Sequence, residues 1–404
     1  MYFAQGSNSN LLSRSQESEC CALRSRANVA FDGLPSAGMD IAVPDYEGKS
    51  LINLVAELEH RLTGEAVAPR PTRELRKKIP EAESYVLVLF DGLGSHQLDH
   101  PAASELAASQ RASIDAPFPY TTTVSLSSIA TGRPPSQHGI LAYQLWMEQV
   151  QRVVNTIHMT TLWGEALDLD YESILPGPNL WERLKEAGRE PIAVQPGHFD
   201  RTPLTRTLYR GAQFRPYWSE QEAVEVVVSA ASEPGRLVFL YIPHVDFAAH
   251  VGGQGSSEYD EAMKTANSVW KGLTESLPRT VTLVGTADHG HVDIAEDHKV
   301  RLRENTGKHR ILYGVERAMF VKGDGRSLAE GIPATWVPHE DLPDVWGPEP
   351  LHSSFEERRP DGILFAEDNY AVFHKHSNDR LVGYHGGLMA EEREIPLLLR
   401  SVTG

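Results

Sequence analysis

YVLVLFDGLG, residues 85–94, is the stretch that decides the fold. Its first six residues form a short, continuous apolar run, which is typical of a parallel strand buried on both faces. The run stops at Asp91-Gly92, where the chain has to turn. Similar runs recur as IAVQ, LVFLYIP and VTLVGT (192–195, 237–243 and 281–286), with helical patterns between them at 179–187, 218–231 and 257–277. This alternation predicts an α/β fold with a doubly wound, mostly parallel central sheet and helices on both faces.

The segments around these runs predict a core, an arm and a cap. Residues 1–36 are polar and predict a flexible N-terminal arm, and LINLVAELEHRL (51–62) predicts an amphipathic helix. Residues 296–369 are irregular and rich in Pro, Gly and charge, which predicts a small cap or insertion. Strand character returns in YAVFHK and IPLLLR (370–375 and 395–400). We therefore expect a core domain made of 37–295 and 370–404.

Composition limits the classes of function. The chain has 404 residues, 41% of them hydrophobic, and a formal net charge of −17. That charge argues against binding a nucleic-acid duplex, which is met by clustered Lys and Arg, but a bound metal could still attract a small anion. No apolar run approaches the length of a membrane span. With two adjacent cysteines, Cys20 and Cys21, and no recognisable secretory signal, we expect a cytoplasmic protein. The oligomeric state is not indicated.

Acidic and imidazole side chains follow several of the predicted strands. Asp91 directly follows the first strand, Asp246 comes three residues after the run that ends at 243, and Asp288 and His289 follow the run that ends at 286. His250 is four residues after Asp246, and one helical face would carry both. His385 lies in a Gly-rich turn.

Each of these residues alone has a simpler explanation as a turn or helix-cap residue. In a parallel sheet, however, ligands bind beyond the carboxyl ends of the strands. Three carboxylates and three imidazoles gathered at that edge are suited to two zinc ions, with manganese or iron as alternatives.

A hydroxyl-rich run, Thr121-Thr122-Thr123-Val124-Ser125, stands where a helix should begin before Gly132. A hydroxyl at a helix N-terminus suits phosphoryl transfer, because free N–H groups and the positive end of the helix dipole receive phosphate oxygens. Taken alone, the run is better explained by an N-cap with β-branched strand residues before it than by catalysis.

Five motifs occur together, in order: LFDGLG (89–94), TTVSLSSIATGRPPSQHGI (122–140), HVDFAAH (244–250), TADHG (286–290) and GYHGG (383–387). With these motifs the chain resembles the alkaline phosphatase superfamily, and within it the bacterial members of the nucleotide pyrophosphatase/phosphodiesterase branch. The resemblance implies that one metal is held by Asp91, Asp288, His289 and the nucleophile oxygen. It implies that the other is held by Asp246, His250 and His385. Counting back from Gly132 gives Thr122 as the nucleophile, with Thr121 and Thr123 as the alternatives in register.

The chain departs from the family pattern at three positions. The family's phosphate-binding Asn corresponds to Ser125, the residue after D-H-G is His291 rather than the usual Met, and Ala249 stands where Gly often precedes the His. Ser125 is the candidate substrate-binding residue. We expect substrate preference to depend on residues 139–200 and on the cap, which include Trp146, Trp163, His198, Arg317 and Trp336, although packing is the commoner role for such side chains.

The resemblance implies a two-zinc phosphohydrolase that cleaves a nucleotide-type phosphodiester or pyrophosphate through a phosphothreonine intermediate. The alternative within enzymes is a phosphomonoesterase or a phosphonate hydrolase similar to phosphonoacetate hydrolase. The alternative outside enzymes is a protein that binds a phosphorylated ligand without turnover.

Overall fold

The computed structural model describes residues 40–170, 174–302 and 310–400, so the predicted arm at 1–36 lies outside the described residues. The larger sheet in this part of the chain has the strand order β2-β18-β9-β1-β8-β6-β7. From β9 to β7 the strands are parallel, whereas β18 runs antiparallel to both β9 and β2. The strands are β1 (Ser84–Phe90), β2 (Gln110–Asp115), β6 (Glu190–Pro196), β7 (Gln213–Tyr217), β8 (Arg236–Ile242), β9 (Val281–Thr286) and β18 (Glu394–Leu399).

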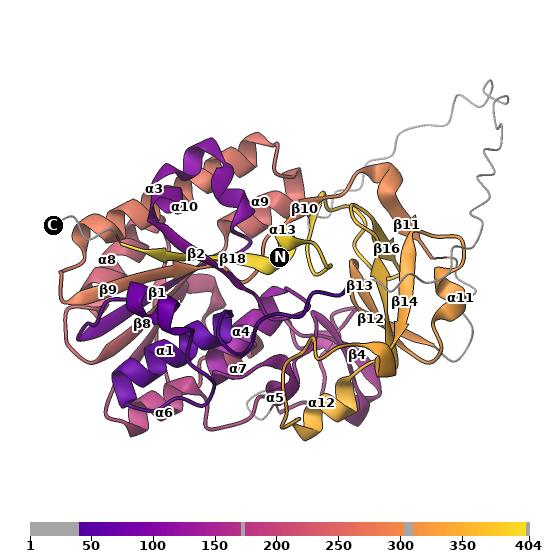
Figure 1. Cartoon of the computed structure of the whole chain (residues 1–404), viewed down its shortest axis with the longest axis horizontal. Coiled ribbons are helices and arrows are strands. Elements are labelled where there is room, and N and C mark those ends of the chain that lie inside the picture. Colours follow the sequence, from indigo (N-terminus) through magenta and orange to yellow (C-terminus); the bar gives the residue numbers. More distant parts are fainter. Residues whose placement is uncertain (1–39, 171–173, 303–309, 401–404) are drawn as a thin grey trace. The chain divides into compact units, whose positions relative to one another are not determined.

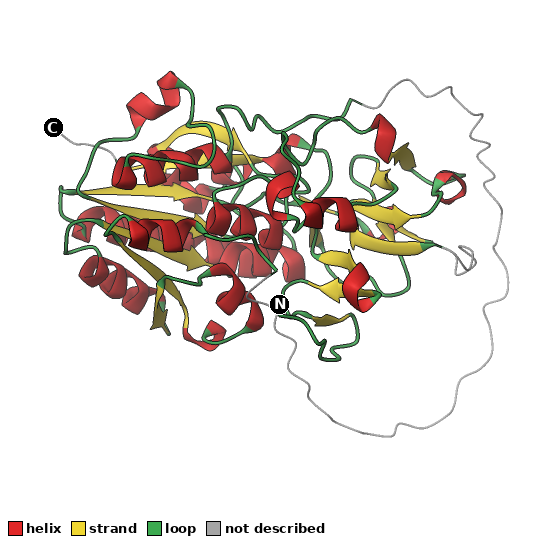
Figure 2. Cartoon of the chain, turned by 90° about the horizontal axis from the view of Figure 1, so that it is seen from below, coloured by secondary structure: helices red, strands yellow, loops and turns green. Residues whose placement is uncertain are grey.

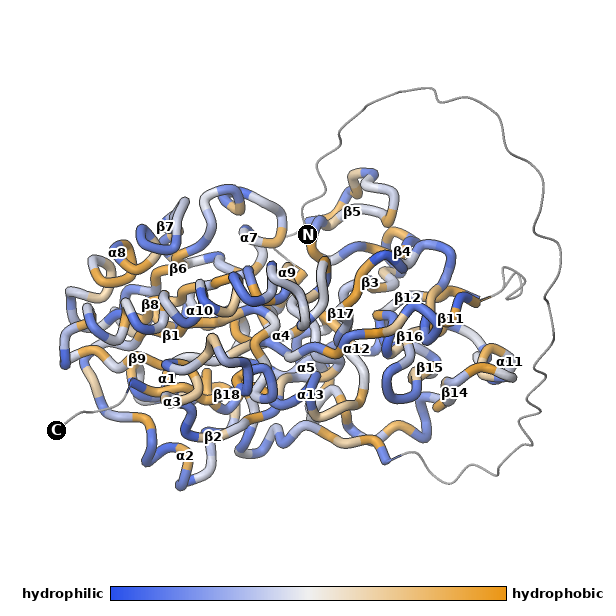
Figure 3. The backbone as a smooth tube through the Cα atoms, turned by 90° about the horizontal axis from the view of Figure 1, so that it is seen from above, coloured by the Kyte–Doolittle hydropathy of each residue, from blue (hydrophilic) through white to orange (hydrophobic). Residues whose placement is uncertain are grey.

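Strand β1 lies in the middle of this sheet, between β8 and β9. All seven of its residues are buried, as are all six residues of β9, because helices cover both faces. Figure 3 shows the same strands in the hydrophobic colours of the scale. The continuous apolar runs of the sequence therefore correspond to the central strands, as expected for parallel strands.

Two helical layers cover the sheet (Figures 1 and 2). In one layer α1 packs on α4 and α6, and in the other α10 packs on α3, α8 and α9. The helices are α1 (Leu51–Thr63), α2 (Arg73–Lys78), α3 (Ser104–Ser109), α4 (Thr122–Thr131), α5 (Pro135–His138), α6 (Leu180–Glu186), α7 (Pro203–Leu208), α8 (Glu220–Ala230), α9 (His244–Gly252) and α10 (Ser257–Ser276). The prediction of an α/β fold with a doubly wound, mostly parallel sheet is confirmed.

A second sheet is antiparallel, with the order β14-β15-β13-β12-β3-β4-β5 among the described residues. Its strands are β3 (Gln144–Met147), β4 (Arg152–Asn155), β5 (Thr160–Thr161), β12 (Ile311–Val315), β13 (Ala318–Lys322), β14 (Ala334–Pro338) and β15 (Gly362–Ala366). The cap predicted at 296–369 thus forms only part of this sheet. Residues 144–161, which the sequence analysis places in the core, complete it. Their strands are too short and polar for the apolar-run pattern to reveal them.

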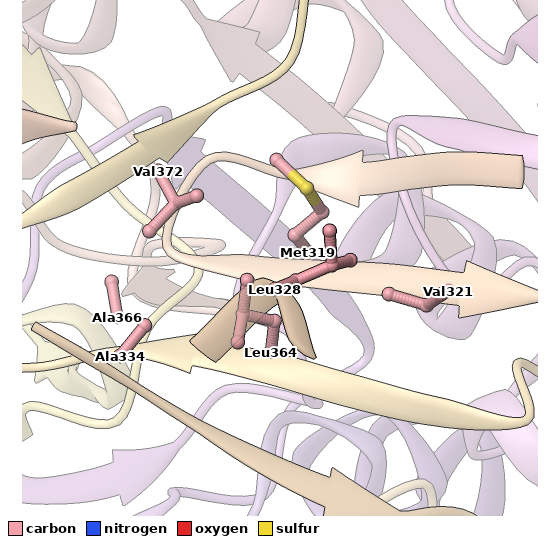
Figure 4. Close-up of a cluster of buried hydrophobic side chains, with 7 residues drawn as sticks. All are labelled: Met319, Val321, Leu328, Ala334, Leu364, Ala366 and Val372. Atoms are coloured by element: carbon pink, nitrogen blue, oxygen red, sulfur yellow. The ribbon is translucent and has the colours of Figure 1, made fainter. Parts of the chain in front are cut away.

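Apolar side chains pack on both sides of the second sheet. On one side, Leu328 of α11 (Arg326–Ala329) covers the cluster in Figure 4: Met319, Val321, Ala334, Leu364, Ala366 and Val372. Elsewhere on the sheet, Phe365 lies 6.0 Å from the Phe118 ring and Phe320 lies 5.8 Å from the Trp346 ring, which itself contacts Phe118. Through Phe118 the second sheet contacts the loop that leads into α4.

Short elements complete the described structure. β10 (Val292–Asp293) pairs with β17 (Gly383–Tyr384), and β11 (Lys299–Arg301) pairs with β16 (Ala371–Phe373). Helix α12 (Ser353–Arg358) lies between β14 and β15 in the chain, and helix α13 (Ala390–Arg393) directly precedes β18. Among the described residues, every helix is too short or too polar to cross a bilayer.

Candidate metal centre

The predicted metal-binding residues meet at the carboxyl edge of the larger sheet. Asp91 follows β1, and its backbone N–H donates to Ile242 at the end of β8. Asp246 lies in the first turn of α9, directly after β8, and its N–H donates to the carbonyl of Asp91. Asp288 follows β9, and its Oδ1 accepts from the N–H of Gly92 at 3.0 Å. Because β8, β1 and β9 are neighbours and parallel, their ends must converge there.

One group of side chains, the carboxylate cluster, consists of Asp91, Asp288, His289 and Thr122. His289 Nε2 lies 3.6 Å from Asp91 Oδ1 and 3.4 Å from Asp288 Oδ2. Thr122 Oγ1 lies 3.4 Å from Asp91 Oδ1 and 3.2 Å from His289 Nε2. Ligands of a tetrahedral zinc ion with bonds of about 2.0–2.1 Å stand about 3.3 Å apart, so these separations are those of atoms that share one ion.

The carboxylate cluster is electrostatically incomplete without a cation. Burial, followed by the charges of Asp288 and Asp246, raises the pKa of Asp91 well above its usual value. Asp288 Oδ2 is buried and accepts no hydrogen bond from the described residues. In that part of the chain, the ion-pair partners of Asp91, Asp288 and the neighbouring Asp246 are all histidines. An uncompensated group of buried carboxylates is costly, and a divalent cation would remove that cost.

A second group, the imidazole cluster, consists of Asp246, His250, His385 and His291. Asp246 Oδ1 lies 3.2 Å from His250 Nε2, 2.9 Å from His291 Nε2 and 3.9 Å from His385 Nε2. It also lies 3.9 Å from His289 Nε2, which joins the two clusters. Here His250 and His291 hold the pKa of Asp246 well below its usual value although burial opposes them.

Backbone carbonyls orient three of the imidazoles. His250 Nδ1 lies 2.7 Å from the carbonyl of Gly383, His385 Nδ1 lies 2.8 Å from that of Tyr120, and His289 Nδ1 lies 3.1 Å from that of Gly290. A carbonyl on Nδ1 keeps the proton there and leaves the lone pair of Nε2 for a metal. Burial, followed by the neighbouring imidazoles, lowers the pKa of His385 well below its usual value, so that ring is neutral as a ligand must be.

Helix α4 brings a hydroxyl to the carboxylate cluster. The helix begins at Thr122 after the extended residue Thr121 and ends at Thr131, where it is capped by Gly132, whose φ of 67° suits glycine. Thr121 is buried, and Thr123 is buried where its Oγ1 accepts from Thr156 at 3.1 Å. Thr122 is the one of the three threonines whose hydroxyl reaches Asp91 and His289. The geometry therefore favours Thr122 over both register alternatives.

Ser125 lies one turn further along α4 and is buried. Its hydroxyl donates to the backbone carbonyl of Asp288 at 2.8 Å. In this arrangement Ser125 supports the loop that carries Asp288 and His289. Its role as a donor to substrate stays a prediction.

Two residues of the centre are absent from the sequence-based set. The Tyr241 hydroxyl, at the end of β8, donates to Asp91 Oδ2. His291 lies in the imidazole cluster, and burial lowers its pKa to about 4 although Asp246 opposes this. The sequence holds a signal for both residues: Tyr241 is a polar group near the end of an apolar strand, and His291 is two residues from His289.

The loop that carries His385 depends on the second sheet. Arg317, in the turn between β12 and β13, donates to Glu392 through Nε at 3.0 Å and Nη2 at 2.8 Å. Both side chains are almost completely buried, and Glu392 Oε1 also accepts from the N–H of Gly387 at 2.8 Å. Arg317, named in the sequence analysis as a possible specificity residue, therefore has a structural role.

A scan against protein-family models matches residues 85–388 to type I phosphodiesterase / nucleotide pyrophosphatase. The chain belongs to this family. It is accordingly a metal-dependent hydrolase of the phosphodiesterase and nucleotide pyrophosphatase type within the alkaline phosphatase superfamily. The matched range contains all seven predicted metal ligands and includes both clusters.

Solved structures agree with the fold. Murine ectonucleotide pyrophosphatase / phosphodiesterase 5 is 19% identical with a TM-score of 0.62, and the match covers 78% of this chain and 87% of that one. An inactive variant of the murine protein in complex with AMP has the same identity and coverage, with a TM-score of 0.61. The human protein is 18% identical over the same shares of the two chains, with a TM-score of 0.60. No curated protein matches the sequence.

Proposed function

We propose that this chain is a two-zinc phosphodiesterase that cleaves a nucleotide-type phosphodiester or pyrophosphate through a phosphothreonine intermediate on Thr122. The observation that carries the proposal is the position of Thr122 Oγ1, 3.4 Å from Asp91 Oδ1 and 3.2 Å from His289 Nε2. A hydroxyl among metal-binding groups at the start of a helix is the arrangement that an oxygen nucleophile for phosphoryl transfer requires.

The ligands divide between two ions. Asp91, Asp288, His289 and Thr122 would hold one, and Asp246, His250 and His385 the other. Oxygen and imidazole ligands suit zinc, with manganese or iron as alternatives. When bound, the two divalent ions supply positive charge for phosphate oxygens and lower the pKa of a coordinated hydroxyl or water.

The chain's own groups supply the nucleophile, bind the phosphate and orient a metal ligand. Thr122 Oγ1 attacks the phosphorus atom while the ester or anhydride oxygen departs, and a water molecule then hydrolyses the phosphothreonine. The first N–H groups of α4 lack intrahelical acceptors and face the phosphate at the helix N-terminus. The Tyr241 hydroxyl holds one oxygen of Asp91, which orients that carboxylate.

A nucleotide-type substrate is supported by the family and by the AMP complex of the murine protein. The inactive form of that protein replaces a threonine with alanine. We also propose that the protein works in a reducing compartment, the cytoplasm, because its only two cysteines are adjacent.

The test compares p-nitrophenyl phosphate with the p-nitrophenyl ester of thymidine monophosphate. We expect the diester to be cut faster. We expect Thr122→Ala to lower kcat by about 10³-fold or more while the protein keeps its metal, because the nucleophile is lost. Mass spectrometry of wild-type enzyme quenched during cleavage of the diester should find the thymidylyl group, bound through its phosphorus to Thr122 Oγ1, on the peptide that contains Thr122.

Thr123→Ala is the matched control, since this neighbouring hydroxyl contacts Thr156 rather than the cluster. It should change kcat by only a few-fold. Faster cleavage of the monoester would refute the proposed substrate class. An active Thr122→Ala variant would refute the nucleophile, and a zinc-loaded wild type without turnover on either ester would favour a binding protein.

A further inference from the structure

His291 differs from the other histidines of the centre in the environment of its second ring nitrogen. His250, His289 and His385 each have Nδ1 within 3.1 Å of a backbone carbonyl. His291 Nδ1 is buried and has no hydrogen-bond partner among the described residues. Its Nε2 lies 2.9 Å from Asp246 Oδ1, the closest contact that this oxygen makes in the imidazole cluster.

This difference bears on the tautomer of His291. A neutral imidazole has one N–H and one lone pair. If Nε2 bound a metal, the proton would sit on Nδ1 and leave a buried N–H without an acceptor, which is rare in proteins. If Nε2 carries the proton, it donates to Asp246, and only a lone pair stays unpaired. The second arrangement is the more favourable one, because it leaves a buried lone pair rather than a buried N–H without a hydrogen-bond partner.

The His291 ring is held in place from several directions. Its backbone carbonyl accepts from Gln97 Nε2 at 3.0 Å and from Gln254 Nε2 at 3.2 Å. Gly92, with a φ of 75°, lies so close that a Cβ there would stand 2.9 Å from the His291 ring and 2.8 Å from Asp246 Cα. The residue His291 is only 1% exposed. It therefore has little freedom to turn away from Asp246.

We propose that His291 is a positioning residue that donates its Nε2–H to Asp246 Oδ1 and thereby fixes the carboxylate that serves the second metal. A carboxylate oxygen has two lone-pair directions, so Oδ1 can accept from His291 and keep the other direction for the second metal, which His250 and His385 would also hold. Hydrogen bonds to metal ligands commonly change metal affinity by about 10–100-fold. The inference rests on the second metal of the proposed function.

The test uses two variants of the full chain loaded with zinc or cobalt. His291→Leu removes the donor, whereas His291→Gln places an amide N–H near the position of Nε2. Competition with a chromophoric chelator gives the dissociation constant of each metal, and the visible spectrum of the cobalt protein reports its ligands. We expect His291→Leu to weaken one of the two sites by about 10–100-fold. We expect His291→Gln to stay within about threefold of the wild type and to keep its cobalt spectrum.

His374→Leu is the matched control. This part-buried histidine contacts Gln144 Oε1 at 3.0 Å, outside both clusters, so its loss should leave both dissociation constants unchanged. Equal weakening by His291→Leu and His291→Gln with an altered cobalt spectrum would make His291 a ligand and overturn the proposal. Unchanged affinity in His291→Leu would overturn it too. A wild type that binds no divalent metal would instead refute the proposed function, so the two failures are distinguishable.

Discussion

The two clusters of the candidate metal centre both bury carboxylates, but they differ in how far neighbouring side chains balance the negative charge. In the carboxylate cluster, two carboxylates share one imidazole, and burial with like charge raises the pKa of Asp91. In the imidazole cluster, one carboxylate contacts His250 and His291, and its pKa is lowered. The first cluster therefore demands a cation, whereas the second is partly balanced by its own side chains.

The clusters also differ in what holds them. The carboxylate cluster is built on β1, β9 and α4, elements of the larger sheet and its helices. The imidazole cluster takes His385 from a loop that Arg317 and Glu392 hold against the second sheet. The comparison suggests that a change in the second sheet can impair one metal site while the other persists.

The largest expected effect comes from removing one carboxylate ligand from either cluster. Asp288→Asn should lower kcat by about 10³-fold or more and reduce the bound metal from two equivalents to one, because the carboxylate cluster loses a charged ligand. Asp246→Asn should have a similar effect on kcat and leave the other equivalent. Elemental analysis with kinetics checks both. Asp293→Asn, at an exposed position in β10, is the control and should keep both metals. Loss of both metals in either variant would mean that the clusters are not separable.

Arg317→Leu should have the next largest effect. It leaves Glu392 buried without its partner, so the free energy of unfolding should fall by about 3–5 kcal/mol. Metal should be lost from the imidazole cluster first. Denaturant unfolding and metal titration measure the two effects. Arg236→Leu, which breaks a more exposed pair with Glu190, should cost less than about 1 kcal/mol. Equal costs in the two variants would contradict the assigned role of Arg317.

The metal-free protein should show the opposite charge balances in its pH dependence. Because the pKa of Asp91 is raised in the folded state, the stability that Asp91 contributes is fully present below its unfolded pKa of about 4. That stability is lost as pH rises through the folded pKa. Because the pKa of Asp246 is lowered in the folded state, the stability that Asp246 contributes is present above about pH 4 and is lost as pH falls through the folded pKa.

As pH rises above about 4, thermal unfolding in chelator should therefore show a smaller loss of Tm in Asp91→Asn than in the wild type, by about 3 °C or more. Asp246→Asn should show a smaller fall in Tm below about pH 4 than the wild type. If Tm depended on pH in the same way in the wild type and in Asp91→Asn, the raised pKa of Asp91 would be contradicted.

The smallest expected effect concerns Ser125. Since its hydroxyl donates to the carbonyl of Asp288, Ser125→Ala should lower the free energy of unfolding by about 1 kcal/mol and change kcat/KM by only a few-fold. Ser127→Ala, two residues along the same helix, serves as the comparison. A tenfold fall in kcat/KM without loss of stability would instead make Ser125 a donor to substrate.

Much of the fold and the site could be predicted from the chain. The apolar runs at β1, β6, β8 and β9 are continuous because both faces of these strands are buried, so local composition reveals them. Parallel neighbours end at the same edge, which made the gathering of Asp91, Asp246 and Asp288 predictable. Strands β3–β5 were not predictable, because they are short and depend on pairing with β12 and with one another.

The sequence by itself determined the central strands, the residues at their ends and the family pattern, since these depend on local hydrophobicity and spacing. Only the tertiary structure decided which threonine reaches the cluster, that Ser125 contacts Asp288, and that His291 and Tyr241 contact the ligand carboxylates. The physical reason is that hydrogen bonds depend on distances of about 3 Å between atoms far apart in the chain, and spacing along a sequence does not specify them.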